Sequence, residues 1–131
     1  MTERSVPGTP GELLELVAAH AATGDVDALV ALHSDDAVFQ PEPAVVYRGH
    51  DEIRAALKEF TTLNPRITYH GERDVVQAGT VALVASRWSM TGTAPDGSTV
   101  REGGLSADVL RQRDDGSWCV VINQPRGEPI T

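Results

Sequence analysis

Two hydrophobic periods divide the chain. From residue 9 to residue 65 apolar positions recur every three or four residues, as on one face of a helix. From residue 67 to residue 124 they alternate with polar positions, as on strands. The change of period predicts an α+β domain in which helices come first and strands follow.

Three helices are predicted in the first half. A capping box at residues 9–12 opens the first, and Gly24 ends it. Asp25 caps a second, shorter helix, whereas Asp51 opens a third that residues 64–65 terminate. The expected inward-facing residues are Leu13, Leu16, Val17, His20 and Ala21; Val26, Leu29, Val30 and His33; and Ile53, Ala56, Leu57 and Phe60.

A short strand at 37–39 precedes the third helix, and longer strands follow at 67–76, 81–91, 100–113 and 118–124. Short turn-like segments separate the four longer strands, which favours antiparallel hairpins. The predicted order is α-α-β-α-β-β-β-β. It forms one domain over residues 9–125, between a flexible N-terminus (1–8) and a loose tail (126–131).

The last strand is apolar on both of its faces. Trp118, Val120 and Ile122 alternate with Cys119 and Val121. Such a strand is typical of a sheet that is covered on both sides. The helices can cover only one side, so we expect a homodimer packed through the outer sheet face.

The composition is that of one ordinary globular domain, with 131 residues, 40% of them hydrophobic and 23% charged. No apolar run reaches the length of a membrane span, and the first residues do not form a secretory signal. The single Cys119 cannot form an internal disulfide, which fits a reducing compartment. We therefore expect a cytoplasmic protein with no membrane partner.

Charge and motif content exclude several kinds of partner. A net charge of −8 with scattered basic residues argues against nucleic acid. No two His residues have the spacing of a metal site, and the glycines form no nucleotide-binding loop. The sequence predicts neither a metal nor a cofactor.

Several short segments occur in a characteristic order. They are GDVDAL at 24–29, DDAVF at 35–39, Gly49 before Ile53, Trp88, PDG at 95–97, DVLR at 108–111 and DGSW at 115–118. In this order the chain resembles the SnoaL-like branch of the nuclear transport factor 2-like superfamily over nearly its whole length. The resemblance implies a cone, in which a curved antiparallel sheet wraps around the N-terminal helices and leaves an apolar pocket.

Members of that superfamily include ketosteroid isomerases, polyketide cyclases, epoxide hydrolases, dehydratases and non-catalytic binding proteins, so the fold implies a pocket and not a reaction. Ketosteroid isomerisation needs a carboxylate base, a Tyr and a neutral Asp. The resemblance places the base at Pro41, the Tyr at Val17 and a supporting Tyr at Leu57, which cannot do this chemistry. Only the Asp has a counterpart, Asp108, so steroid-type isomerisation is disfavoured.

The candidate catalytic residues are Asp108, His20 and Glu42. In a dry cavity the pKa of Asp108 would rise and the group could act as an acid; alternatively it is a structural Asp paired with Arg87 or Arg111. His20 could be a donor or base beside the position of the lost Tyr, or a hydrogen-bonded core residue. Glu42 follows the position of the missing base.

Further residues are candidates for ligand binding. Tyr47 could close the pocket mouth, and Asn123 could orient a ligand without acting as a base. Arg87 and Trp88 alternate along one strand, so only one of them can face the cavity; we expect Arg87 inside and Trp88 on the dimer face. The candidates are Val17, His33, Tyr47, Leu57, Arg87 and Asn123.

These expectations describe a small-molecule pocket protein that binds or transforms a small, mostly apolar oxygenated compound. If it is an enzyme, it is an isomerase, cyclase or hydrolase that uses general acid–base chemistry without a metal. A non-catalytic ligand-binding module and a dimeric interaction module remain the alternatives. The deciding feature is whether at least two titratable groups converge inside the cavity.

Overall fold

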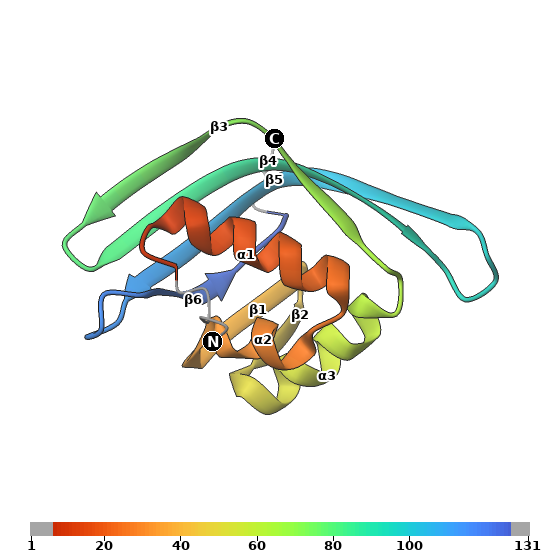
Figure 1. Cartoon of the computed structure of the whole chain (residues 1–131), viewed down its shortest axis with the longest axis horizontal. Helices are drawn as coiled ribbons and strands as arrows, with labels where there is room; N and C mark the ends of the chain where they lie inside the picture. The colour runs from red at the N-terminus through yellow and green to blue at the C-terminus, as the bar shows by residue number, and fades with distance from the viewer. Residues whose placement is uncertain (1–6, 127–131) are drawn as a thin grey trace, which may run out of the picture.

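The computed structural model describes residues 7–126, in which a bent sheet is crossed on its concave side by the first helix (Figure 1). The second and third helices lie below the first and extend the same layer. The elements are α1 (Pro10–Thr23), α2 (Val26–Ala31), β1 (His33–Glu42), β2 (Val45–Arg48), α3 (Gly49–Thr61), β3 (Arg66–Ala78), β4 (Val81–Thr93), β5 (Thr99–Gln112) and β6 (Trp118–Asn123).

The six strands form one sheet in the order β2-β1-β6-β5-β4-β3. The hairpins from β3 to β6 are antiparallel, as predicted. The expectation of a wholly antiparallel sheet is wrong at one place, because β1 and β6 pair in parallel. Helix α3 and four strands separate these two in the chain, and a connection of that length lets neighbouring strands run in the same direction.

The first strand is longer than the predicted 37–39, and it forms a hairpin with β2, which the sequence did not predict. His33 consequently begins β1 and does not lie on the second helix. Pro41 and Pro43 suggest a chain break, but the last paired position between β1 and β6 is Phe39 with Asn123. A proline beyond that position removes no hydrogen bond from this ladder.

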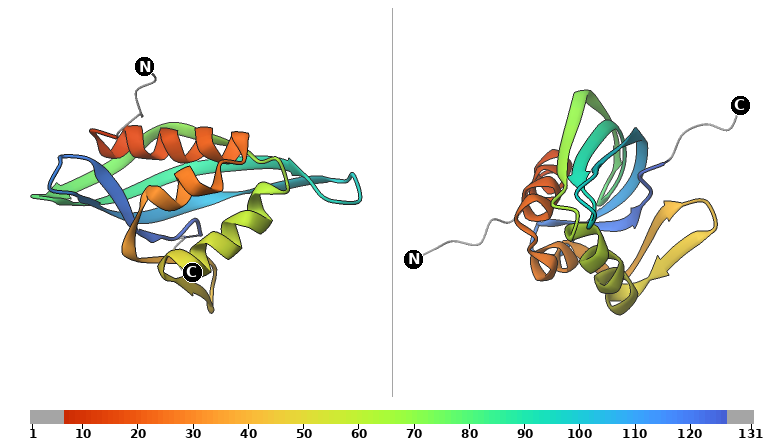
Figure 2. Two further views of the ribbon diagram at one scale, coloured as in Figure 1. Left: turned by 60° about the horizontal axis from the view of Figure 1, so that its bottom comes forward. Right: turned by 90° about the vertical axis from the view of Figure 1, so that its right-hand side faces the viewer.

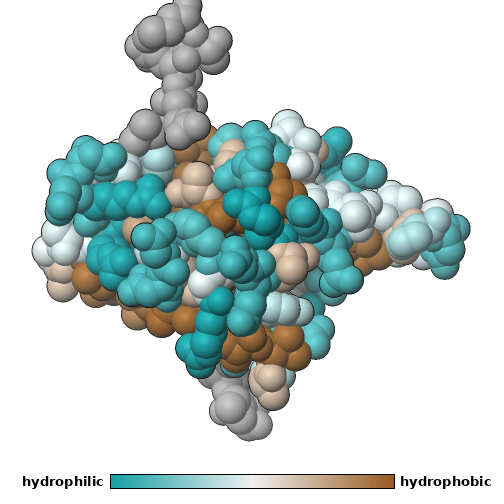
Figure 3. Space-filling view, turned by 90° about the horizontal axis from the view of Figure 1, so that it is seen from below, coloured by the Kyte–Doolittle hydropathy of each residue, from teal (hydrophilic) through white to brown (hydrophobic). Residues whose placement is uncertain are grey.

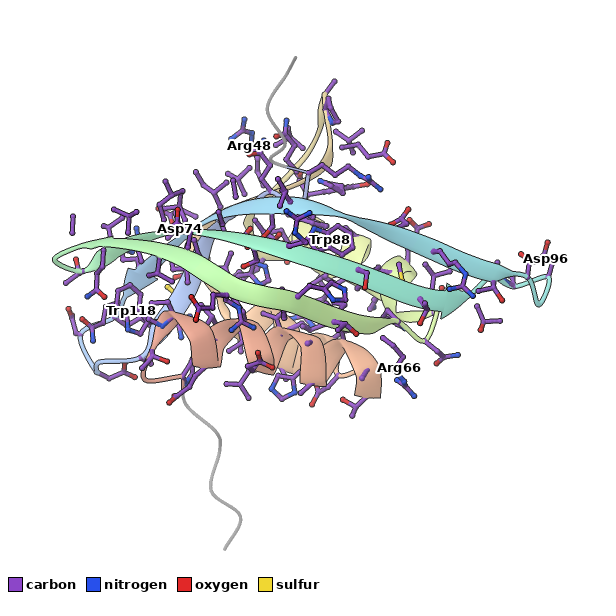
Figure 4. All side chains as sticks on the ribbon, turned by 90° about the horizontal axis from the view of Figure 1, so that it is seen from above. Arg48, Arg66, Asp74, Trp88, Asp96 and Trp118 are labelled. Atoms are coloured by element: carbon purple, nitrogen blue, oxygen red, sulfur yellow. The ribbon has the colours of Figure 1, made fainter. Side chains whose placement is uncertain are left out.

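Helix α1 begins and ends as its sequence indicates. The Thr9 side chain accepts a hydrogen bond from the Glu12 amide at 3.1 Å, and Gly24 closes the helix with φ of 73°. Its buried residues pack on the inner face of the sheet, where Trp118 lies beside the start of the helix (Figure 4). This core cluster comprises Leu13, Leu14, Leu32, Ala82, Val84, Leu110, Trp118 and Val120.

A second core cluster joins the end of α1 to α2, α3 and β1. Its buried members are Ala21, Leu29, Val30, Ala37, Ile53 and Leu57. Figure 2 shows α2 and α3 close to β1, and the view from below in Figure 3 shows a mainly hydrophilic surface with separate apolar patches. The helices are therefore amphipathic, with their apolar sides turned toward the sheet.

A bulge bends β3 and so curves the sheet. The register with β4 shifts between His70 and Asp74, and Gly71 within this segment has φ of 69°. A β-bulge bends its strand and increases the local twist. Beyond the bend, the β4–β5 hairpin projects from the body and ends near Asp96 (Figure 4). The curvature leaves the concave face open to hold a cavity.

Apolar side chains form a row on the opposite, outer face. Val76 pairs with Leu83, Leu83 with Val109, and Val109 with Ile122, so the row crosses four neighbouring strands. Leu83 is 50% exposed, and Val76 and Ile122 are also exposed. By contrast, Cys119 of the last strand is buried. We call the row Val76, Leu83, Val109 and Ile122 the outer apolar row.

The predicted flexible ends fall mostly on residues 1–6 and 127–131, which lie outside the described residues. The remaining positions of those ends make contacts with the domain. The Pro7 carbonyl accepts a hydrogen bond from the Trp118 amide at 2.9 Å, and Arg126 pairs with Glu102. Within residues 7–126 no helix has the length and apolar character needed to cross a membrane.

Candidate functional site

A cavity of about 170 Å³ lies between the concave face of the sheet and the helices. Most of its wall is apolar, and a cavity of roughly this size is large enough for a single aromatic ring. Its apolar lining includes Val17, Leu29, Phe39, Leu57, Phe60 and Ile67. The polar groups that enter this wall therefore decide what it can do.

Asp108 is the buried acid of the cavity. It lies on β5 opposite the buried Val84, and only 6% of its surface is exposed. Its Oδ1 atom accepts a hydrogen bond from the Gln124 amide at 3.0 Å, and the Ser106 hydroxyl donates another. Burial outweighs these hydrogen bonds and raises the pKa of Asp108 to about 7. The carboxyl can therefore be either a proton donor or an acceptor near neutral pH.

No described basic residue forms an ion pair with Asp108. Arg111 instead pairs with Asp36 at 3.2 Å, and Arg87 is exposed. Arg87 lies three residues from Val84, the partner of Asp108, so its side chain points to the opposite face of the sheet. The structure therefore shows a desolvated acid and not an Arg-paired one.

Tyr69 contributes a second polar group beside Asp108. It lies on β3 opposite Trp88, and both residues line the cavity. Burial, followed by the charge of Asp108, raises the pKa of Tyr69, so the phenol stays protonated and can donate a hydrogen bond. The Arg73 guanidinium lies 4.5 Å above the centre of the Tyr69 ring and is itself held by Glu15.

Sequence reasoning missed Tyr69, because the resemblance directed attention to a Tyr on the first helix. The strand alternation contained a usable signal, since Ile67 and Tyr69 are two residues apart and share a face. Trp88 was also placed wrongly. It faces the cavity, whereas Arg87 faces outward, because Trp88 lies four residues from the buried Val84 and so shares its face of the strand. Its Nε1 donates to the Pro125 carbonyl at 2.7 Å.

His33 brings a third titratable side chain into the wall. Its Nδ1 atom lies 2.8 Å from the Leu29 carbonyl at the end of α2. Burial lowers the pKa of His33, which keeps the ring neutral. Its other ring nitrogen, Nε2, is buried and has no hydrogen-bond partner among residues 7–126.

The other candidate residues divide into two groups. Val17, Leu57, Asn123 and Glu42 line the cavity, whereas His20, Tyr47 and Arg87 do not. Helix α1 presents Val17 and Ala21, one turn apart, to the cavity. His20 directly precedes Ala21, so its side chain leaves the helix about 100° around the axis from that of Ala21. Tyr47 lies on β2 and stacks on Phe39, with 6.0 Å between the ring centres.

The segment after β6 builds one side of the cavity. Pro125 and Arg126 belong to the lining, and Arg126 pairs with Glu102 at 3.5 Å. The Gln124 side chain donates to Gln40 on β1 at 2.6 Å. The described residues contain no group of three or more His, Cys, Asp or Glu side chains that could hold a metal ion.

Comparison with models of protein families shows which family the chain belongs to. The model of the SnoaL-like domain matches residues 14–121, which is most of the sequence. The chain belongs to the SnoaL-like domain family. No curated protein matches this SnoaL-like chain.

Solved structures, one of them of a member of the nuclear transport factor 2-like superfamily, confirm the predicted fold. A superfamily member from Salmonella enterica has a TM-score of 0.78 at 17% identity, covering 92% of this chain and 89% of its own. A ketosteroid isomerase-like protein from Erwinia carotovora has a TM-score of 0.74 at 20% identity, covering 86% and 88%. A candidate scytalone dehydratase from Novosphingobium aromaticivorans has a TM-score of 0.78 at 16% identity, covering 86% and 77%. At these identities the likeness concerns the fold alone.

Proposed function

We propose that this SnoaL-like protein binds a small, mostly apolar molecule through a carbonyl-type oxygen and transforms it by general acid–base chemistry. The observation that carries the proposal is the burial of Asp108 in an apolar cavity, without an ion-pair partner among the described residues. A carboxylic acid kept neutral in such a site can donate a hydrogen bond to an oxygen that gains negative charge.

Tyr69 supports the same chemistry. Its phenol is protonated, lines the same cavity and is close enough for the charge of Asp108 to raise its pKa. Two neutral donors in one apolar cavity suit an oxygen that becomes an enolate or a leaving hydroxyl. Isomerisation and dehydration both pass through such an oxygen, and the similar structures include an isomerase-like protein and a candidate dehydratase.

The residue that removes a proton from carbon differs from the one in the steroid isomerases. Pro41 lines the cavity at the position that the resemblance gives to the base, and it has no acid–base capacity. Glu42 also lines the cavity and is exposed at its edge. We propose Glu42 as the carboxylate available to move a proton at the mouth, with Asp108 acting deeper inside.

The experiment is a turnover screen on one-ring and two-ring ketones, hydroxy ketones and epoxides. The wild type is compared with Asp108→Asn and with Asp74→Asn, an exposed carboxylate on β3 that serves as the matched control. We expect turnover by the wild type and the control, and a loss of at least about 100-fold in the Asp108 variant. Turnover that Asp108→Asn leaves unchanged would contradict the proposed role.

One observation favours a second function, non-catalytic ligand binding. The described hydrogen-bond partners of Asp108 are the Gln124 amide and the Ser106 hydroxyl, and neither can act as a second acid or base near neutral pH. A protein that binds ketones in the same screen, yet converts no compound, fits this alternative.

We also propose that the protein is a homodimer that packs through the outer apolar row. The row crosses four strands and includes three exposed large aliphatic side chains, Val76, Leu83 and Ile122. Contiguous exposed apolar surface of this kind commonly marks a protein–protein interface. The partner in this proposal is a second copy of the chain.

A further inference from the structure

One ring nitrogen of His33, a residue of the cavity wall, lacks a hydrogen-bond partner in the described part of the chain. His33 is 2% exposed, it lines the cavity, and its Nε2 atom has no hydrogen-bond partner among residues 7–126. Leaving a buried acceptor without a partner destabilises the folded chain. Such a cost is unusual in a folded protein, and it is removed if a ligand supplies the missing partner.

The hydrogen bond at the other nitrogen determines what Nε2 can do. The Leu29 carbonyl can only accept, so the Nδ1 atom 2.8 Å away from it carries the proton. In the neutral ring Nε2 is then a lone-pair acceptor. Two positive or potentially positive groups disfavour a second proton, because His50 and Arg113 both bond to the His33 backbone carbonyl, at 2.9 Å and 3.4 Å.

The position of His33 allows one ligand to reach both ends of the cavity. His33 lies on β1 and Asp108 on β5, and β6 runs between these two strands. Neighbouring strands are about 4.8 Å apart, so two strand spacings separate the two backbones by about 10 Å. A single ring with polar substituents can occupy the space between side chains that extend from both strands.

We propose that His33 selects ligands that carry a hydroxyl or N–H donor, to which its Nε2 atom offers the acceptor. The inference rests on the proposed function and narrows it, because the compound then has a donor at the His33 end and an acceptor oxygen at the Asp108 end. The ligand class is a compact hydroxylated or amino-substituted ring compound.

The test uses three one-ring probes of similar size. Phenol has a donor, anisole has only an acceptor, and toluene has neither. We expect phenol to bind the wild type about tenfold more tightly than toluene or anisole, since a buried acceptor regains its hydrogen bond. Dissociation constants come from titrations followed by amide chemical shifts of the cavity residues.

Two variants test whether His33 causes the preference for phenol over toluene. In His33→Phe the ring remains and both nitrogens are lost, so we expect phenol and toluene to bind with equal affinity. His70→Phe is the matched control, because His70 is exposed on β3, outside the cavity lining, and should keep the preference for phenol. Equal affinities for phenol and toluene in the wild type would overturn the inference.

A second measurement does not depend on the fold of a variant. In the wild type, the imidazole ¹⁵N shifts of His33 should show a protonated Nδ1 and an unprotonated Nε2, and phenol but not toluene should move the Nε2 signal. A proton on Nε2, or equal responses to both probes, would refute the inference. If acetophenone binds but phenol does not, the inference fails and the proposed function stands. If neither acetophenone nor any of the three probes binds, the proposed function itself fails. Binding of all three without preference removes only the role of His33.

Discussion

The burial of Asp108 has a measurable consequence for stability. Below about pH 4 its carboxyl is protonated in both the folded and the unfolded chain. Between the ordinary pKa of 3.8 and the folded pKa of about 7, the unfolded chain releases this proton while the folded chain keeps it. The unfolded state then binds fewer protons, so Asp108 makes the folded state progressively less stable as the pH rises through this window.

The size of the effect follows from the two pKa values. Each unit of difference is worth 1.36 kcal/mol, so a rise from 3.8 to about 7 corresponds to about 4 kcal/mol. Above pH 7 the penalty is complete and no longer changes. In Asp108→Asn the side-chain oxygen still accepts from the Gln124 amide, but the group does not titrate. The free energy of unfolding of Asp108→Asn, relative to that of the wild type, should therefore increase by about 4 kcal/mol between pH 4 and pH 8.

The assay is urea unfolding followed by tryptophan fluorescence at a series of pH values and one protein concentration. The quantity of interest is the unfolding free energy of Asp108→Asn minus that of the wild type, because the other titrating groups cancel in this difference. The Asp74→Asn variant, which replaces an exposed carboxylate on β3, is the matched control. Parallel curves for the wild type and Asp108→Asn across the whole range would refute the burial argument.

Three further predictions concern the cavity, the hairpin and the outer face. Tyr69→Phe should weaken binding of a one-ring ketone such as acetophenone about tenfold in a titration, and an unchanged affinity would remove Tyr69 from the site. Gly92→Ala places a Cβ atom 2.8 Å from the Leu63 carbonyl and should destabilise the fold by about 1–3 kcal/mol in urea unfolding, whereas Gly11→Ala, whose Cβ meets nothing closer than 3.8 Å, should not. Leu83→Glu should turn the proposed dimer into a monomer in sedimentation experiments, and a wild type that is already monomeric would rule the dimer out.

The predictable part of the fold rests on local physical signals. Thr9 and Gly24 lie where a helix must begin and end, so the limits of α1 could be read from the chain. The hairpins of the second half follow from alternation and turn residues. The parallel pairing of β1 with β6 could not be predicted in this way, because it depends on two segments more than 70 residues apart.

The candidate site shows the same division. The sequence identified Asp108 as an acid in an apolar strand, and the alternation of Arg87 and Trp88 established that only one of them faces inward. It could not decide which, nor whether an Arg would neutralise Asp108. That choice depends on which face of the sheet the helices cover, and on the bulge at Gly71 that bends β3. Tyr69 became a site residue for the same reason, whereas His33 was already a candidate from the sequence and lines the cavity from β1.

The amino-acid sequence by itself therefore indicated the order of helices and strands, the family and an acid within an apolar strand. Capping, periodicity and turn chemistry act over a few residues and can be read locally. Only the tertiary structure decided how that acid behaves. The pKa of Asp108 rises because the sheet, the helices and the segment after β6 together exclude water from its carboxyl, without placing a cation beside it. Desolvation is a property of the whole enclosure, and no local pattern in the chain encodes it.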